Sequence, residues 1–204
     1  LPNIKFKGIG TNLACRSGVT PNAKNMDKLS TLASSIDTTF GFEMEVVSGG
    51  NSGNFEWAFS GVDTRRINNL RFGESILLGL DPLNRKPIDG LHIDAFKLIA
   101  EVIEAKVKPS QPWGEIAQTA FGPSQPITNQ GNISQVLLAL GEQDTDPNGL
   151  TSPPGVEILG ASSDHLILDA NNNLSVGDEI AFQMNYSALV RAMTSPFIVK
   201  VMSE

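Results

Sequence analysis

Two glycine-rich turns contain the residues of this sequence that are best suited to bind an anion. The first is the segment 48–53, Ser-Gly-Gly-Asn-Ser-Gly, which follows an apolar strand-like segment and precedes a short helix-like one. The second is the segment 71–74, Arg-Phe-Gly-Glu, at the end of the next strand-like segment. Small residues leave backbone N–H groups free to converge on an anion at the start of a helix. Either turn alone is also typical of a flexible loop, so the prediction rests on the pair facing one ligand.

The first eighty residues alternate strand-like and helix-like segments, which is typical of βα units and a parallel sheet. Strands are expected at 4–9, 43–47 and 67–72. A helix is expected where apolar residues recur between Met26 and Ile36, with N-cap residues before it and Gly41 after it. A short helix is expected near Phe55. In a parallel sheet the two glycine-rich turns would share one edge.

The segment 81–90 is rich in turn residues, and we predict a domain boundary that divides the chain into residues 1–85 and 86–204. Beyond it, strand-like runs are separated by Pro, Gly and Asn clusters, so the second domain is expected to be all-β. Acidic residues at Glu142, Asp144 and Asp146 are typical of a solvated loop. The predicted strands are 95–107, 115–121, 135–140, 156–159, 166–169, 179–185 and 197–202.

The length of the first domain indicates only part of a larger architecture. A closed (β/α)8 barrel takes ~250 residues, whereas about three βα units fit here. Three parallel strands would leave an open sheet edge. We therefore expect an α/β plus all-β chain: the last βα units of a (β/α)8 barrel followed by a C-terminal β domain. The chain begins at Leu1 without a methionine, and we expect it to be a fragment of a longer protein.

Composition excludes several classes of partner. The 15 basic and 22 acidic residues give a formal net charge of −7, which argues against binding to nucleic acid or to anionic membranes. One cysteine, Cys15, and two histidines, His92 and His165, are too few for a disulfide framework or a metal cluster. Apolar runs fall short of the ~18 residues of a membrane span. We expect a cytoplasmic protein without metal, in which Cys15 is a packed residue.

Several segments together resemble the fold-type III pyridoxal-phosphate enzymes, whose best-known member is alanine racemase, and within them the ornithine racemase-like subgroup. They follow one another in order along nearly the whole chain: 8–13 (GIGTNL), 48–52 (SGGNS), 69–79 (NLRFGESILLG), 94–96 (DAF) and 155–165 (GVEILGASSDH). The resemblance implies pyridoxal 5'-phosphate as cofactor.

The resemblance also implies roles for individual residues. Ser52 and the backbone of Gly73 and Glu74 would bind the cofactor phosphate, and Arg71 would face the pyridine nitrogen. A guanidinium is always protonated, so it disfavours protonation of that nitrogen. Asn12 stands where alanine racemase has a histidine near the ring. The implied cofactor-binding residues are Asn12, Asn51, Ser52, Arg71, Gly73 and Glu74.

The sequence departs from the family at both catalytic bases. The family's aldimine lysine lies on the first barrel strand, and Lys5 and Lys7 belong to a later strand. The family's second base is a tyrosine from the partner subunit, yet no tyrosine lies between 114 and 122, where Ile116 or a neighbour takes its place. The only tyrosine, Tyr186, is expected in the core. The catalytic residues of this chain therefore stay unassigned.

Ser163, Asp164 and His165 match the family segment that approaches the partner subunit's substrate entrance. The resemblance implies that they read a cationic substrate side chain such as that of ornithine, in a homodimer with shared active sites. An ordinary turn, with Asp164 capping a backbone donor, is the alternative interpretation.

The resemblance implies an amino-acid racemase fragment that interconverts L- and D-amino acids, alanine or ornithine-like, by α-proton abstraction from an external aldimine. Without the lysine strand, the fragment alone is expected to be inactive. Two alternatives remain open at this point. One is another fold-type III enzyme, of the decarboxylase or D-threonine aldolase type, and the other is a non-catalytic interaction module.

Overall fold

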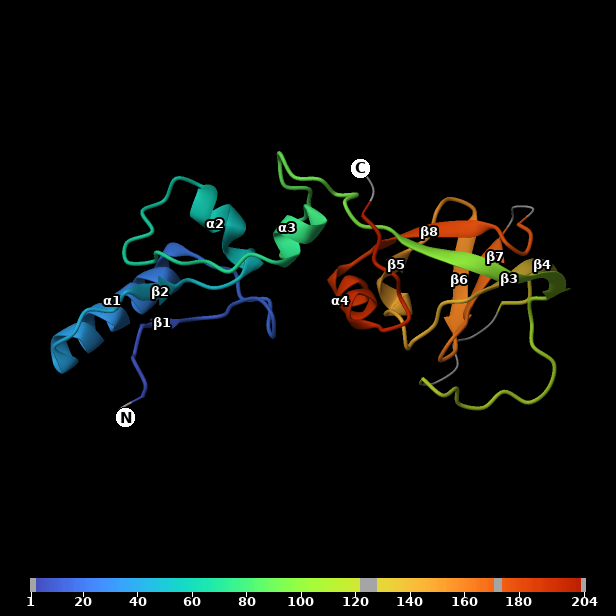
Figure 1. Ribbon diagram of the computed structural model, residues 1–204, viewed down its shortest axis with the longest axis horizontal. Helices are drawn as coiled ribbons and strands as arrows, with labels where there is room; N and C mark the ends of the chain where they lie inside the picture. The colour runs from blue at the N-terminus through green and yellow to red at the C-terminus, as the bar shows by residue number, and fades with distance from the viewer. Residues whose placement is uncertain (1–2, 122–127, 171–173, 203–204) are drawn as a thin grey trace. The chain divides into compact units, whose positions relative to one another are not determined.

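A computed structural model describes residues 3–121, 128–170 and 174–202 and divides the chain into two compact units (Figure 1). The first unit comprises Leu1–Ala95 and the second Phe96–Glu204. The boundary predicted from the sequence, between residues 85 and 86, lies slightly earlier within the same connecting region. Among the described helices, none combines the length and the apolar character that crossing a bilayer requires.

The first unit is built around short parallel strands and one long helix. Strand β1 pairs in parallel with β2, and Ser48 at the end of β2 forms a further parallel bridge with Asn69. The predicted strands are therefore present but short, and the third is reduced to this bridge. That these segments close a (β/α)8 barrel stays a prediction. The elements are β1 (Gly8–Gly10), α1 (Ala23–Phe40), β2 (Val46–Ser48), η1 (Ser52–Asn54), α2 (Phe55–Phe59) and α3 (Glu74–Leu78).

Local sequence signals fix both ends of α1. The Asn22 side chain accepts a hydrogen bond from the Asn25 backbone N–H, and the Asn25 side chain accepts one from the Asn22 N–H in return. Gly41 ends the helix in the left-handed conformation, with φ of 66°. Between these caps, Met26 and Ala33 are buried against β2 in a core that includes Val47. The predicted helix is thus confirmed, with its expected glycine stop.

The second unit is a curled antiparallel sheet of six strands in the order β5-β8-β3-β4-β7-β6 (Figure 1). This confirms the predicted β domain, and most of the predicted strands are present within a few residues. The elements are β3 (Leu98–Pro109), β4 (Asn132–Leu138), η2 (Pro147–Gly149), β5 (Leu150–Thr151), β6 (Val156–Ala161), β7 (Leu166–Ala170), β8 (Glu179–Met184) and α4 (Tyr186–Thr194).

One face of this sheet forms the core of the second unit. Alternate residues of β4 and β7, among them Val136 and Leu168, are fully buried, and Phe182 from β8 fills the same core. Helix α4 contributes Ala192 to this core. The opposite face of β4, β6 and β7 carries the intervening residues, including Gln135 and Asp169.

Several predictions about the second unit are wrong. Residues 115–121 and 197–202 form no strand: the first range contains only an isolated bridge at Thr119, and in the second Val199 and Met202 are almost fully exposed. Helix α4 was not predicted, although the Asn185 side chain caps it by accepting from the Ala188 N–H at 2.9 Å. Tyr186 begins this helix and is 39% exposed, so it is not a core residue.

Candidate functional site

The carboxyl ends of three parallel segments bring the predicted cofactor residues together in the first unit. Ile9 in β1 lies opposite Val47 in β2, and Ser48 at the end of β2 lies opposite Asn69. The loops that follow these segments therefore start at one edge of the sheet. The Arg71 N–H donates to the Gly50 carbonyl at 2.8 Å, which joins the two glycine-rich turns directly.

Arg71 is fixed by three acceptors at this edge. Its Nη2 donates to the Thr11 carbonyl oxygen at 3.2 Å and to Asn12 Oδ1 at 3.3 Å, and its Nη1 donates to Ser48 Oγ. The residue is nevertheless exposed. The planar guanidinium holds several acceptors at once and so stays ordered without a core around it. The structure thus brings Asn12 and Arg71 into contact.

Ser52 forms a second connection between the two glycine-rich turns. The residue is only 5% exposed, and its Oγ accepts hydrogen bonds from the Gly73 N–H at 3.1 Å and from the Ser75 N–H at 3.2 Å. These two bonds occupy the lone pairs of the hydroxyl. No group in the described ranges accepts its proton. The hydroxyl is therefore oriented as a donor that lacks an acceptor.

Asn51 and Asn12 are linked through Cys15. Asn51 Nδ2 donates to Cys15 Sγ at 2.9 Å, and Asn12 Nδ2 donates to the same sulfur at 3.3 Å. Asn51 Oδ1 also caps the turn by accepting from the Gly53 N–H at 3.0 Å. Cys15 is exposed, so the prediction that it is a packed residue is wrong. It lies among the candidate cofactor residues instead.

The first turn requires glycine at position 50. Gly50 has φ of +133°, and a Cβ there would lie 2.6 Å from Asn54 Oδ1. In the second turn, Gly73 precedes α3 and Glu74 begins it, while the Glu74 carboxylate forms an ion pair with Arg85. The ion pair neutralises this carboxylate. The group of Glu74 that can bind an anion at the site is therefore its backbone N–H.

Sequence reasoning found these turns but missed the groups that orient them. The hydroxyl of Ser48, the carbonyl of Thr11 and the N–H of Ser75 each bond a predicted site residue. The signal for Ser48 was its place as a polar residue at the end of an apolar strand. Backbone groups such as those of Thr11 and Ser75 leave no trace in residue type, so the sequence could not identify them.

The predicted substrate-reading residues form the turn between β6 and β7 in the second unit. Asp164 Oδ1 accepts from Ser163 Oγ at 2.8 Å and from Ser162 Oγ at 3.3 Å, and it lies 3.3 Å from His165 Nδ1. The Ser163 hydroxyl, followed by the charge of His165, lowers the pKa of Asp164 below its ordinary value. The turn therefore presents a carboxylate that is ionised at neutral pH.

The loop before β5 is hydrogen-bonded to this turn. The Gln143 N–H donates to the Ser163 carbonyl at 2.9 Å. Asp144 is 4% exposed, and it accepts from the Gly141 N–H at 3.0 Å and from Ser195 Oγ at 3.3 Å. The prediction of a solvated acidic loop is therefore wrong for Asp144, because its carboxylate satisfies neighbouring donors inside the unit.

We expect Ser163→Ala to raise the pKa of Asp164 toward its ordinary value, because the variant loses the shortest hydrogen bond to the ionised form. A depressed folded-state pKa stabilises the fold above the unfolded-state pKa, and this contribution disappears as pH falls through the folded-state value. NMR titration of the Asp164 carboxyl carbon measures the change. Ser35→Ala on the exposed face of α1 is the control. Equal Asp164 pKa values in the parent chain, Ser163→Ala and Ser35→Ala would contradict the conclusion that the Ser163 hydroxyl lowers this pKa.

Two curated relatives match nearly the whole chain. An ornithine racemase of Acetoanaerobium sticklandii is 43% identical over 204 residues, which cover 98% of this chain and 58% of that protein. A lysine racemase of Thermotoga maritima is 42% identical over 197 residues, covering 95% of this chain and 56% of that protein. The chain thus spans a little over half the length of these relatives.

Solved structures show the same fold at low sequence identity. An alanine racemase from Bartonella henselae with covalently bound pyridoxal phosphate has a TM-score of 0.56 at 19% identity, over 93% of this chain and 51% of that one. A D-threonine aldolase from Filomicrobium marinum has a TM-score of 0.56 at 17% identity, over 92% and 46%. No family model matches the chain. Over most of its length the chain is thus similar in sequence to part of two amino-acid racemases and similar in fold to part of alanine racemase, as expected for a portion of a fold-type III racemase.

Proposed function

We propose that this chain is part of a pyridoxal-phosphate-dependent amino-acid racemase, and that its first unit binds the cofactor. The observation that carries the proposal is Ser52. Its hydroxyl is buried, both lone pairs are engaged by the Gly73 and Ser75 amides, and its proton lacks an acceptor among the described residues. An anionic oxygen is the acceptor that such a donor fits best. A phosphate group meets this requirement, and the residues of the site therefore fit the cofactor.

In this proposal the residues of the first unit bind the cofactor and orient it. The Ser52 hydroxyl and the backbone N–H of Glu74 would hold the phosphate, while the Gly73 N–H orients the Ser52 hydroxyl toward it and the Asn51 side chain keeps the first turn closed. When bound, pyridoxal phosphate withdraws electrons from the α-carbon of the amino acid, which makes its proton acidic. Arg71 donates to the pyridine nitrogen and keeps it unprotonated, since the guanidinium does not give up its proton. Asn12 holds the guanidinium in place.

We further propose a basic amino acid, such as ornithine or lysine, as the substrate. The names of the two relatives support this class over alanine. The Asp164 carboxylate, with its lowered pKa, is suited to accept hydrogen bonds from a side-chain ammonium. In the proposed assembly it does so across a homodimer with shared sites. The homodimer and the cytoplasmic location stay predictions.

The groups that move the α-proton are proposed to lie in the part of the relatives that this chain does not span. Lys5 and Lys7 are both engaged in ion pairs with Glu45. The segment 114–122 contains no tyrosine. We therefore expect the 204-residue chain alone to show no racemase activity.

A chimaera tests the proposal. In it, this chain replaces the matching part of the A. sticklandii ornithine racemase. We expect the chimaera to bind pyridoxal phosphate and to racemise ornithine or lysine. The 204-residue chain alone is expected to racemise neither amino acid. Ser52→Ala should weaken cofactor binding by about ten- to a hundredfold, the usual cost of a lost hydrogen bond to a charged group. Absorbance titration of the cofactor measures the affinity.

Ser35→Ala is the matched control, because this serine lies on the exposed face of α1 and should leave cofactor affinity unchanged. A folded chimaera that binds cofactor normally despite Ser52→Ala would show that the phosphate lies elsewhere. A folded chimaera that binds cofactor but racemises no amino acid would overturn the proposed reaction while leaving the cofactor site intact.

A further inference from the structure

We propose that the second unit contains a binding site for a small alkylammonium ligand. A cavity of about 730 Å³ lies over the β4, β6 and β7 face that points away from the core, beneath the segment that follows β3. Its lining combines apolar side chains with two carboxylates, Glu157 and Asp169. The site is argued from the second unit alone and does not depend on the proposed racemase activity.

The two carboxylates are direct cross-strand neighbours. Glu157 in β6 lies opposite Asp169 in β7. Two like charges at opposed positions of an antiparallel pair destabilise it. Asp169 Oδ1 is also shielded from solvent and accepts no hydrogen bond from any described residue. A buried carboxylate oxygen without a partner is costly. A cationic hydrogen-bond donor in the cavity would remove both penalties.

Lys108, which lines the cavity, and Lys106, which lies opposite Gln135 on β4, do not pair with these carboxylates. Lys106 and Lys108 both bind Glu104, each at 2.5 Å from a different carboxylate oxygen. These hydrogen bonds lower the pKa of Glu104 to about 2. Within the described ranges, neither Glu157 nor Asp169 has an ion-pair partner. The cavity therefore keeps a net negative charge.

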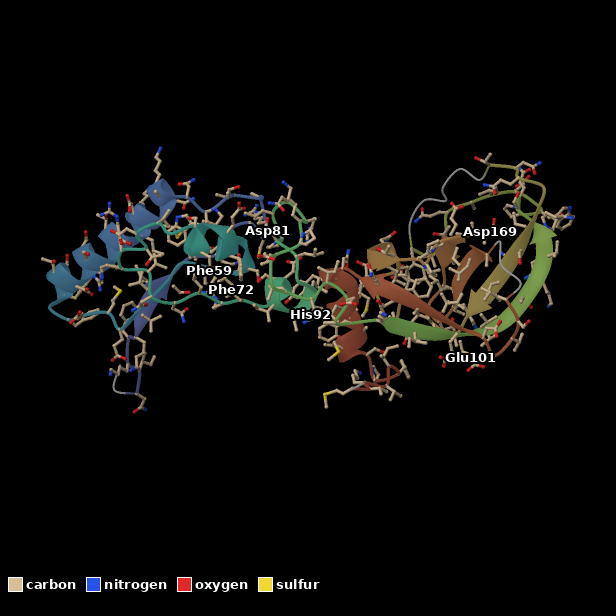
Figure 2. All side chains as sticks on the ribbon, turned by 90° about the horizontal axis from the view of Figure 1, so that it is seen from above. Phe59, Phe72, Asp81, His92, Glu101 and Asp169 are labelled. Atoms are coloured by element: carbon tan, nitrogen blue, oxygen red, sulfur yellow. The ribbon has the colours of Figure 1, made fainter. Side chains whose placement is uncertain are left out.

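A second acidic pair on the same sheet provides a contrast. Glu101 in β3 lies opposite Glu179 in β8, and both residues are exposed. Water screens that pair and solvates its oxygens. Figure 2 places Glu101 and Asp169 on different sides of the second unit. Glu157 is exposed as well, so the cavity pair differs only at Asp169, whose Oδ1 is shielded from solvent and has no hydrogen-bond partner among the described residues.

The remaining lining selects an organic cation with an apolar stem. Ile133, Ile158 and Ile167 line the cavity beside the carboxylates. Trp113 also lines it and is fully exposed, so its ring is free to contact a cation. The described residues contain no group of three metal-ligating side chains, so the charge is matched better by one ammonium group than by a coordinated metal ion.

Calorimetric titration of the 204-residue chain with n-pentylamine tests the site, with pentanol as the uncharged analogue of the same length. We expect saturable binding of the amine, little binding of the alcohol and a change in Trp113 fluorescence. Asp169→Asn keeps the side-chain shape and removes the charge, and it should weaken amine binding at least about tenfold. Glu101→Gln removes one charge from the exposed acidic pair and should leave binding unchanged.

Thermal unfolding shows whether Asp169→Asn remains folded. Because it relieves the repulsion with Glu157, we expect the unliganded variant to be at least as stable as the parent chain. Equal binding of amine and alcohol, equal amine affinity in the Asp169→Asn chain, or no saturation by about 10 mM amine would overturn the proposal. Binding of a blocked lysine tripeptide but not of the free amine would assign the cavity to a protein side chain, which also overturns it.

Discussion

Arg71→Glu in the chimaera is expected to lower the kcat/KM of racemisation at least about a hundredfold, a loss typical for removal of a preorganised charged group at a reacting centre. The substitution places a carboxylate beside the Ser48 hydroxyl, the Thr11 carbonyl and Asn12 Oδ1, which now bind the guanidinium. A carboxylate there favours protonation of the pyridine nitrogen, whereas Arg71 opposes it. Pyridoxal phosphate should stay bound, because the Ser52 contacts are untouched. Steady-state kinetics and absorbance of the bound cofactor measure the two effects separately.

Two further variants separate charge from position. Arg71→Lys keeps the positive charge but loses the planar fork, so we expect it to recover only part of the activity. Arg65→Glu is the matched control, because Arg65 pairs with Asp27 on the surface of the first unit. Activity of Arg71→Glu equal to that of Arg65→Glu would show that Arg71 does not act on the cofactor ring.

The predictability of the first unit follows from short-range signals. The Asn22 and Asn25 capping pair and Gly41 define α1 from both ends, and both are visible in the sequence. The glycine-rich turns were also predictable, because Gly50 adopts a conformation that few other residues accept. The contact between the turns depends instead on the parallel pairing of Ser48 with Asn69, a long-range feature without its own sequence signal.

The errors in the second unit have one physical cause. Apolar runs at 115–121 and 197–202 have strand-like composition, but a strand exists only where a neighbour supplies hydrogen bonds. Neither run belongs to the described six-stranded sheet, and Phe197 is 66% exposed. Helix α4 was overlooked because Asn185 was assigned to the end of the preceding strand, although it caps the helix. Composition indicated a β domain, and pairing decided its boundaries.

The candidate site shows a similar division. Residue type indicated the two glycine-rich turns and the family resemblance singled out Ser52 and Arg71 within them, and the structure brings each into contact with another predicted residue. Burial was misjudged for Asp144, which was expected on a solvated loop. Arg71 is exposed because its acceptors lie at the sheet edge, and Asp144 is buried because Gly141 and Ser195 satisfy its oxygens. Whether such a polar side chain is buried or exposed thus depends on hydrogen-bond partners from distant parts of the chain, here Thr11 for Arg71 and Ser195 for Asp144.

Phe182→Ala is expected to lower the free energy of unfolding of the second unit by about 3–5 kcal/mol, the usual cost of truncating a fully buried phenylalanine. Phe182 is 0% exposed and lies opposite Leu98 in the β3–β8 pair, inside the six-stranded sheet. Its ring belongs to the same core as Ala192 of α4. Removing it leaves a cavity between the sheet and that helix, so the second unit should open more readily while the first unit is unaffected.

Hydrogen exchange read by mass spectrometry reports the two units separately, which a single unfolding curve does not. We expect faster exchange in β3 and β8 of Phe182→Ala and unchanged exchange in α1. Phe197→Ala is the matched control, since the same side chain is removed from an exposed position and the expected change is within about 0.5 kcal/mol. Equal exchange protection of β3 and β8 in the two variants would contradict the close packing of α4 and the sheet around Phe182.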